Sequence, residues 1–325
     1  MNRELAQEVC HKLDIEFKEV NFSKNYWNHV FSYLLESYSN GLTPNPDIMC
    51  NKWIKFGTFV DYCLNELKMD VISTGHYAGT SYGDFWQHYD SERTVHLLRP
   101  KDKRKDQTLF LSQISQTSLK KVMFPLQQLC KSEVKSIAKQ NGLTRVAERP
   151  ESQGICFIGK RNFQKFIEQY IEPKPGKFID IDTGVVVGSH EGIHFWTIGQ
   201  NCRIGGMKHK YFVAKKDVQN HIMYVASNTN HSSLYSNQMI VKNMNWICCE
   251  PMAITARQVF ECEFRFQHRD QPQPCRLIKL DDNQFNIQLY SSTRALTEGQ
   301  FAVIYKDNEC LGSAQIDRYW LSSQL

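Results

Sequence analysis

The sequence predicts an α/β domain followed by two domains built mainly from β-strands. Two observations lead to this fold class. Apolar residues in the first half repeat at helical spacing around one short apolar run at residues 70–77, whereas the pattern alternates after Pro173-Lys-Pro-Gly176. A chain of 325 residues is long enough for two or three hydrophobic cores. We therefore expect domains at residues 1–172, 173–232 and 233–325.

Helices dominate the expected first domain. Residues 1–10 form an amphipathic pattern, and the apolar residues from Trp27 to Tyr38 keep a helical period that stops at Gly41, as is typical of a helix C-terminus. Further helical patterns cover residues 54–67, 107–114 and 133–141, the last with Ser132 as the expected N-cap. The run at 70–77 has the pattern of a buried strand that ends at Gly75 and His76. Ligands of open α/β sheets bind outside such strand ends, although a Gly-His pair there is more often an ordinary turn.

Strands dominate the rest of the chain. A last helix is expected over residues 163–171 behind Asn162. Residues 178–181 and 185–187 then flank Asp182-Thr-Gly184 as a hairpin, and residues 211–213 with 222–225 predict another. From about Met239 onward, short strands follow one another at even spacing. Such spacing predicts a compact antiparallel barrel.

Two cysteines lie in unusual settings. Cys50 closes Thr43-Pro-Asn-Pro-Asp-Ile-Met-Cys50, and Cys156 lies in Gly154-Ile-Cys-Phe-Ile-Gly159. The two prolines disfavour helix before them, so we expect an extended, stiff loop that holds Asp47 three residues before Cys50. A carboxylate near a thiol suits proton transfer coupled to sulfur chemistry. The alternative is that both thiols only pack in a core, as expected for Cys63, Cys262, Cys275 and Cys310.

Metal and membrane sites are not expected. The sequence contains no C-x-x-C pair, and the adjacent Cys248 and Cys249 lack a second pair, so we expect no structural metal site. No apolar run approaches 18 residues, which predicts no membrane contact. Eleven cysteines without regular spacing fit a reducing compartment.

The charge of the chain is compatible with a nucleic-acid partner. The net charge is +5, and residues 99–107 hold five cations, namely Arg99, Lys101, Lys103, Arg104 and Lys105. Such a run suits contacts with phosphates, but it equally fits an ordinary solvated loop.

Several blocks together resemble one family, the tRNA-specific 2-thiouridylases, and within it the animal mitochondrial branch. The resemblance covers essentially the whole chain. The blocks that carry it are Gly41-Leu-Thr-Pro-Asn-Pro-Asp47, Cys50-Asn-Lys52, Ile54-Lys-Phe56, Thr74-Gly-His-Tyr-Ala78, Lys105-Asp-Gln107, Gly154-Ile-Cys-Phe-Ile-Gly159 and Gly299-Gln-Phe-Ala-Val303. The resemblance implies ATP-dependent transfer of sulfur to C2 of the wobble uridine, position 34, of tRNA. It also implies a Rossmann-like ATP-pyrophosphatase domain, a small β-rich central domain and a C-terminal β-barrel.

The resemblance also implies residue roles. Cys156 would receive a persulfide sulfur, Cys50 would be the partner nucleophile, and Asp47 would act as general acid or base. Asn45, Pro46 and Asp47 would contact the target base, and Gly75 the adenylate. The remaining implied tRNA contacts are His76, Lys105, Asp106, Gln107, Arg265, Phe266 and Gln300. Implied partners are ATP with Mg²⁺, tRNA, and a sulfur-carrier or cysteine desulfurase system in the mitochondrion.

Two departures from the family pattern leave two hypotheses. The sequence has no Ser-Gly-Gly-x-Asp-Ser phosphate loop, and Thr197-Ile-Gly-Gln-Asn-Cys-Arg203 replaces a more basic pattern. The first hypothesis is a tRNA sulfurtransferase, of which this chain is an N-terminally shortened form. The second is a catalytically inactive tRNA-binding or regulatory protein. From the missing loop we expect this polypeptide to bind tRNA in a salt-sensitive way without adenylating it.

Overall fold

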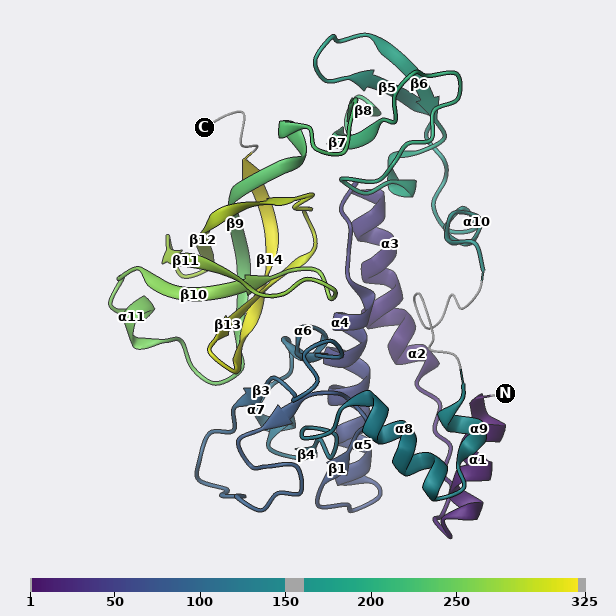
Figure 1. Cartoon of the computed structure of the whole chain (residues 1–325), viewed down its shortest axis with the longest axis vertical. Helices are drawn as coiled ribbons and strands as arrows, with labels where there is room; N and C mark the ends of the chain where they lie inside the picture. Colours follow the sequence, from purple (N-terminus) through teal and green to yellow (C-terminus); the bar gives the residue numbers. More distant parts are fainter. Residues whose placement is uncertain (1, 150–160, 321–325) are drawn as a thin grey trace.

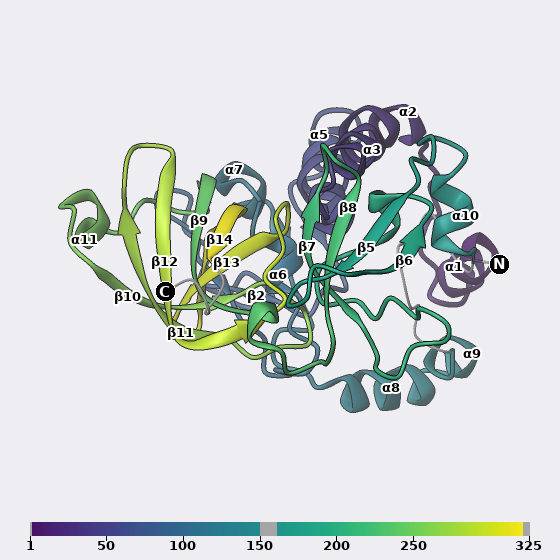
Figure 2. The ribbon, with the colours of Figure 1, turned by 90° about the horizontal axis from the view of Figure 1, so that it is seen from above.

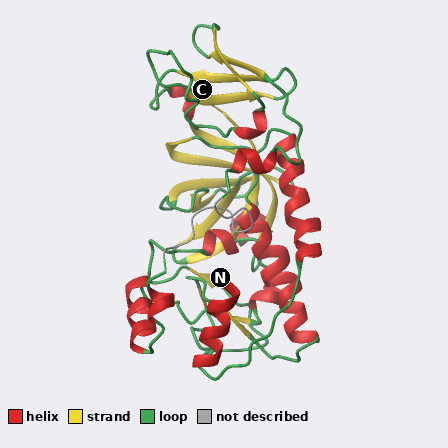
Figure 3. Ribbon diagram, turned by 90° about the vertical axis from the view of Figure 1, so that its right-hand side faces the viewer, coloured by secondary structure: helices red, strands yellow, loops and turns green. Residues whose placement is uncertain are grey.

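The computed structural model describes residues 2–149 and 161–320 (Figure 1). Helices gather in the N-terminal part of the chain, and strands in the central and C-terminal parts (Figure 3). The central sheet and the C-terminal barrel form separate bodies joined by the chain between β8 and β9, at Ile222–Ala226 and Tyr235–Trp246 (Figure 2). The expected fold class is confirmed.

The first helices form a long rod that reaches from the N-terminal domain to the central sheet (Figure 1). After α1 (Asn2–Lys12), the rod consists of α2 (Ser23–Tyr26), η1 (Trp27–Phe31) and α3 (Ser32–Ser39). The apolar stripe points inward, since Val30, Phe31 and Leu34 are almost completely buried. The rod ends where Gly41 adopts a φ of 74°, as its pattern predicts.

A second helical segment begins at Pro46 and carries most of the candidate site. It consists of α4 (Pro46–Cys50), η2 (Asn51–Thr58) and α5 (Phe59–Asn65). The parallel pair β1 (Ile72–Ser73) and β4 (Val122–Met123) lies beside it. The other elements of the N-terminal domain are short: β2 (Gly79–Thr80), β3 (Leu97–Leu98), α6 (Thr108–Leu111), α7 (Gln116–Leu119), α8 (Lys131–Gln140), α9 (Thr144–Ala147) and α10 (Phe163–Ile167).

Several expected helices differ in detail. The one expected at 163–171 ends at Ile167, as α10. The one expected at 107–114 is only the four residues of α6, because the Ser112 and Ile114 amides donate to the carbonyls three residues before them, as in a turn. For α8, the expectation of Ser132 as N-cap is wrong. The N-cap is Cys130, whose amide donates to Glu133 Oε2 at 2.6 Å, and a glutamate at this third helical position satisfies an otherwise unpaired amide.

The central domain is a four-stranded sheet in the order β6-β5-β8-β7. It contains β5 (Gly176–Asp180), β6 (Val186–His190), η3 (Ile193–Phe195), β7 (Phe212–Asp217) and β8. Both predicted hairpins are confirmed, because β5 pairs antiparallel with β6 and β7 antiparallel with β8. The central pair β5–β8 is parallel, which the alternating pattern could not predict.

The C-terminal strands close into a barrel. Strand order is β13-β10-β11-β12-β9-β14, and β14 pairs again with β13. Its elements are η4 (Ser232–Leu234), β9, α11 (Met252–Thr255), β10 (Phe260–Arg265), β11 (Gln273–Lys279), β12 (Gln284–Arg294), β13 (Phe301–Lys306) and β14 (Glu309–Trp320). Between residues 240 and 320 the one helix is the four-residue α11, which confirms the predicted absence of a long helix in this described stretch.

The barrel and the N-terminal domain share structure. Strand β14 also pairs with β3, so the barrel sheet continues into the N-terminal domain. Side chains of β13 alternate between two cores. Phe301, Val303 and Tyr305 pack into the N-terminal core, whereas Ala302 and Ile304 pack inside the barrel. In the described part of the chain, no helix is both long and apolar enough to span a membrane.

Candidate active site

The segment before Asp47 is held by contacts from both the central domain and the barrel. Lys216 Nζ, from the central sheet, donates to the Gly41 carbonyl at 2.9 Å, and the Thr43 and Thr197 hydroxyls lie 3.0 Å apart. On the barrel side, the Thr43 amide donates to the Glu298 carbonyl at 3.0 Å. Gln300 Nε2 then donates to the Thr43 carbonyl at 2.9 Å. The position of the following residues is therefore fixed by the whole molecule.

Asp47 and Cys50 lie in a helix, and the expectation of an extended loop is wrong. Asn45 has extended backbone and is the N-cap, with its side chain accepting from the Ile48 amide at 3.2 Å. Pro46 follows as the first helical residue. Proline disfavours helix only in the residue before it, and its own φ suits the first helical position. The Asn-Pro pair thus begins a helix.

The helix places the carboxylate and the thiol on one face. Residues three apart are neighbours on a helix surface, so Asp47 and Cys50 point to the same side. Both are half-buried. Burial raises the pKa of Asp47, and the nearby Lys55 ammonium opposes that rise. A carboxyl group whose pKa moves toward neutrality is better suited to accept and return a proton.

Gly75 and His76 follow the carboxyl end of β1, as predicted. Gly75 is exposed, and a Cβ placed there would meet no atom within 4 Å, so the space beside it is open. Lys55 Nζ lies 3.5 Å from His76 Nε2, and Thr74 Oγ1 lies 3.0 Å from His76 Nδ1. Burial, with Lys55 as the second cause, lowers the pKa of His76 to about 4. The imidazole is therefore neutral near pH 7.

Lys55 is the residue of this group that the sequence interpretation missed. It lies near both Asp47 and His76 and is exposed. The motif Ile54-Lys55-Phe56 was visible in the sequence. Its relation to Asp47 is not visible there, because the helical pattern of apolar residues starts only at Ile54. The Asn-Pro pair is the signal that could have placed both residues in one helical segment, since α4 continues directly into η2.

A cavity of about 800 Å³ with polar and aromatic side chains on its wall adjoins the fixed segment. Thr43 contributes to its wall, together with residues from α3, from the start of α10 and from the central domain. These are Tyr38, Arg161, Asn162, Phe163, Gln164, His194, Phe195, Trp196, Thr197, Gln200, Asn201 and Arg203. Two arginines and several amides give this wall the chemistry to contact phosphate or a base. The segment 197–203, which departs from the family pattern, lines part of it.

The other candidate tRNA contacts are not brought together in one surface. Lys105 is half-buried, and Gln107 makes two hydrogen bonds to the backbone of Tyr77, at 2.8 and 2.9 Å. Phe266 is 4% exposed in the barrel core. Direct contact between these residues and tRNA stays a prediction.

Asp106 and Arg265 form a buried ionic network. Asp106 is 1% exposed and Arg265 2% exposed. Asp106 Oδ2 accepts from Arg99 Nε at 2.8 Å and from Arg265 Nη1 at 3.4 Å, while Arg265 Nη2 donates to the Tyr305 hydroxyl at 2.9 Å. In this conformation neither side chain is accessible to an RNA. Their contacts instead hold the barrel against the N-terminal domain.

The predicted partner thiol cannot be placed. Cys156 lies outside the described residues, as does the Gly154–Gly159 block around it. The expected approach of Cys50 and Cys156 in one cleft beside Gly75 therefore stays a prediction.

Comparisons with known proteins identify the family. Three family models match, described as a tRNA methyl transferase HUP domain at residues 2–160, a tRNA methyl transferase PRC-barrel domain at 164–227 and an aminomethyltransferase β-barrel domain at 236–316. Mitochondrial tRNA-specific 2-thiouridylase 1 of Drosophila melanogaster is 46% identical over 96% of this chain and 80% of its own length. The human protein of the same name is 44% identical over 96% and 78%. The chain belongs to the tRNA-specific 2-thiouridylase family.

Bacterial 2-thiouridylases are similar as well. The tRNA-specific 2-thiouridylase MnmA of Mesoplasma florum is 42% identical over 96% of this chain and 82% of its own length. The order of the 2-thiouridylase domains agrees with the structure, since the matched segments cover the helical domain, the four-stranded sheet and the barrel. The predicted family is therefore confirmed.

Proposed function

We propose that the protein is a tRNA-uridine 2-sulfurtransferase that uses ATP and a cysteine persulfide to thiolate the wobble uridine. One observation carries the proposal: Asp47 and Cys50 share one face at the start of a helix, and the segment that leads into it is held by the central domain and the barrel. A thiol beside a carboxyl group of raised pKa suits proton-coupled sulfur chemistry. This pair favours an enzyme over a protein that only binds tRNA.

The reaction begins with activation of the base. O2 of uridine attacks the α-phosphorus of ATP, pyrophosphate leaves, and the N3 proton is lost. We assign that proton to Asp47, which returns it when the C2 thione forms. The open space at Gly75, outside the end of β1, is where the adenylate would lie. Neutral His76 beside it can accept or donate a hydrogen bond without adding charge.

Sulfur transfer then uses both thiols. The terminal sulfur of a persulfide on Cys156 attacks C2, and AMP leaves with O2. Cys50 thiolate attacks the Cys156 sulfur, which frees the thiouridine and forms a Cys50–Cys156 disulfide. The two thiols thereby supply the two electrons that reduce the transferred sulfur. An external dithiol must reduce the disulfide before the next cycle.

The cavity beside Thr43 is the proposed place for the nucleotides next to the target base. Arg161 and Arg203 on its wall would neutralise phosphates, so tRNA affinity should fall steeply as salt rises. Asn45, Pro46 and Asp47 remain the proposed contacts of the base itself. Lys105 and Gln107 of the N-terminal domain and Gln300 of the barrel are proposed as separate contacts with tRNA.

The sulfur donor and the location are proposed from the family. A persulfide on Cys156 requires a sulfur-carrier or cysteine desulfurase system, and adenylation requires Mg²⁺ with ATP. Relatives from the fly and from humans are named mitochondrial, which supports a mitochondrial site of action for this protein.

The test follows labelled sulfur. The protein, extended at its N-terminus by a strand and a Ser-Gly-Gly-x-Asp-Ser phosphate loop, is incubated with a cysteine desulfurase, ³⁵S-cysteine, ATP and a tRNA with uridine at position 34, without added dithiol. With the wild-type protein, the tRNA should become labelled. With Cys156→Ser, both the variant and the tRNA should stay unlabelled. Cys50→Ser should trap the label in a protein–tRNA adduct that added dithiol releases. A tRNA with cytidine at position 34 is the control. Labelled free tRNA produced by Cys156→Ser would overturn the proposal.

A further inference from the structure

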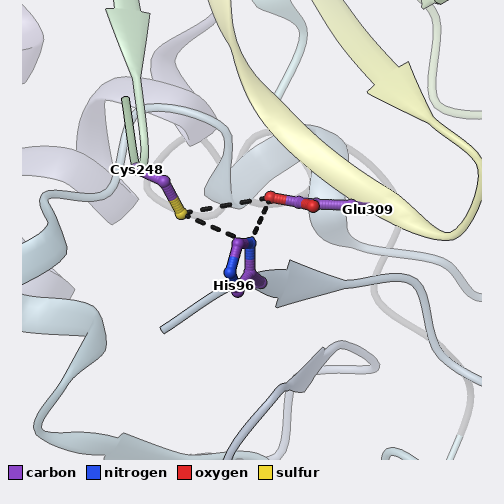
Figure 4. Close-up of side chains that lie close together, drawn as sticks. All are labelled: His96, Cys248 and Glu309. Atoms are coloured by element: carbon purple, nitrogen blue, oxygen red, sulfur yellow. Dashed lines mark hydrogen bonds and ion pairs between the residues drawn. The ribbon is translucent and has the colours of Figure 1, made fainter. Parts of the chain in front are cut away.

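A cluster of three metal-ligating side chains lies at the joint between the N-terminal domain and the barrel. His96, Cys248 and Glu309 point toward one another (Figure 4), and their ligand atoms all lie within 4.8 Å of each other. His96 Nδ1 is 2.7 Å from Glu309 Oε1, and Cys248 Sγ is 3.7 Å from His96 Nδ1 and 4.0 Å from Glu309 Oε1. None of the three takes part in the proposed sulfur transfer.

The backbone at each ligand is fixed. Gln116 binds the two segments that carry His96 and Cys248: its Oε1 accepts from the Val95 amide at 2.8 Å, and its Nε2 donates to the Val95 and Ile247 carbonyls at 2.9 Å each. Glu309 begins β14, where it pairs with Leu98 of β3. The site is therefore pre-organised, as is typical of metal sites whose ligands are held in place by surrounding hydrogen bonds.

The donor set matches one class of cation. A thiolate, an imidazole nitrogen and a carboxylate oxygen together suit zinc and similar divalent transition metals, whereas Mg²⁺ and Ca²⁺ prefer oxygen alone. Zinc bond lengths of about 2.0–2.3 Å place tetrahedral ligand atoms about 3.3–3.6 Å apart. The three observed distances, 2.7, 3.7 and 4.0 Å, each lie within about 0.6 Å of that range, a shift that side-chain rotation alone can supply.

We propose that His96, Cys248 and Glu309 bind one Zn²⁺ ion. The side chains of His96 and Glu309 are 44% and 26% exposed, so an ion and a water as fourth ligand can reach the site from solvent. On binding, the Cys248 thiol releases its proton to solvent. Because His96 belongs to the N-terminal domain and the other two ligands to the barrel, the ion fastens these two domains together.

Cobalt binding tests the proposal on the intact protein. Co²⁺ is titrated into metal-free protein, and sulfur-to-cobalt charge-transfer absorption is recorded. Wild type should bind one ion with this absorption, and Zn²⁺ should displace it and raise the unfolding temperature. Cys249→Ser is the matched control, because Cys249 is the exposed neighbouring thiol outside the cluster, and it should behave as wild type.

The variants decide between a metal site and a hydrogen-bonded cluster. Cys248→Ser should lose the charge-transfer absorption, and His96→Gln and Glu309→Gln should each weaken Co²⁺ binding about tenfold or more. The alternative is that the Cys248 thiol only donates to the Val95 carbonyl, 3.2 Å away. An absorption missing from wild type, or kept in Cys248→Ser, would overturn the metal site. All variants should fold, since each replacement is close in size, and circular dichroism verifies this.

Discussion

Among single residues, Lys55 links the two titratable groups beside the start of the second helical segment. It opposes the rise in pKa that burial imposes on Asp47, and it adds to the fall that burial imposes on His76. The same cation therefore keeps the carboxyl group able to ionise and the imidazole uncharged. A site with an ionisable carboxyl group and an uncharged imidazole suits the binding of a nucleotide, which brings its own negative charge.

Lowering the pH should destabilise the protein through His76. Its pKa in the folded chain, about 4, lies below its ordinary value of 6.5, so the unfolded chain takes up the proton first as pH falls. The stabilising contribution is complete above pH 6.5 and is lost progressively toward pH 4. Urea denaturation at pH 7 and pH 5 should show a smaller loss of unfolding free energy for His76→Gln than for wild type.

A second histidine, His190, provides a parallel test of the same effect. Burial also lowers the pKa of His190 to about 4, so His190→Gln should reduce the pH dependence as well, and the double variant should reduce it further. If His76→Gln kept the full pH dependence of wild type, the neutral imidazole described above would be wrong.

Among the secondary-structure elements, the helix that begins at Pro46 matters most. Proline disfavours helix in the residue before it, so Pro46 restrains Asn45 but leaves Asp47 and Cys50 free to be helical. Asn45 takes the extended conformation that the rule requires, and the helix begins one residue later. The Asn-Pro pair by itself indicates a helix start, because asparagine is a favourable N-cap and proline a favourable first helical residue.

Removing the cap should reduce stability and activity together. Asn45→Ala leaves the Ile48 amide without its acceptor and should cost about 1 kcal/mol of unfolding free energy. Ser115→Ala is the matched control, because Ser115 caps α7 in the same way, through the Ser118 amide at 3.1 Å. Both variants should lose similar stability in denaturation experiments, but thiolation should fall only in Asn45→Ala. Equal thiolation by the two variants would contradict a positioning role for the cap.

In the whole molecule, the barrel and the N-terminal domain act as one unit. They share a sheet through β14 and β3 and a core through β13. The buried network of Asp106, Arg99 and Arg265 crosses the same joint. Asp106 and Arg265, which sequence resemblance predicts as tRNA contacts, thus also hold these two domains together.

Arg265→Met should therefore act mainly on stability. It leaves Asp106 buried with one fewer cation, and breaking a buried pair from one side costs about 3–5 kcal/mol. The control is Arg276→Met, which removes an ion pair to Glu261 whose side chains are about half exposed, at 48% and 53%, and should cost less than about 1 kcal/mol. Chemical denaturation measures both. A loss for Arg265→Met no larger than that for Arg276→Met would contradict the structural role.

Features set by neighbouring residues could be predicted from the sequence, whereas contacts between segments far apart in the chain could not. Periodicity predicted the helical rod ending at Gly41, both hairpins of the central domain and the barrel strands, because each depends on neighbouring residues. It could not predict that Gln300 holds Thr43, or that His96, Cys248 and Glu309 meet. Spacing-based rules expected no metal site because they search for ligands close together in sequence, and these three come from three separate segments.

The most direct test of the proposed function is the 2-thiouridine content of tRNA in the organism that encodes this protein. The native gene is edited to Cys50→Ser, Cys156→Ser or Cys249→Ser, and wobble nucleosides are quantified by mass spectrometry. We expect 2-thiouridine to disappear in the first two strains and to match wild type in the third. Normal 2-thiouridine in either the Cys50→Ser or the Cys156→Ser strain would contradict the two-thiol sulfur transfer on which the account depends.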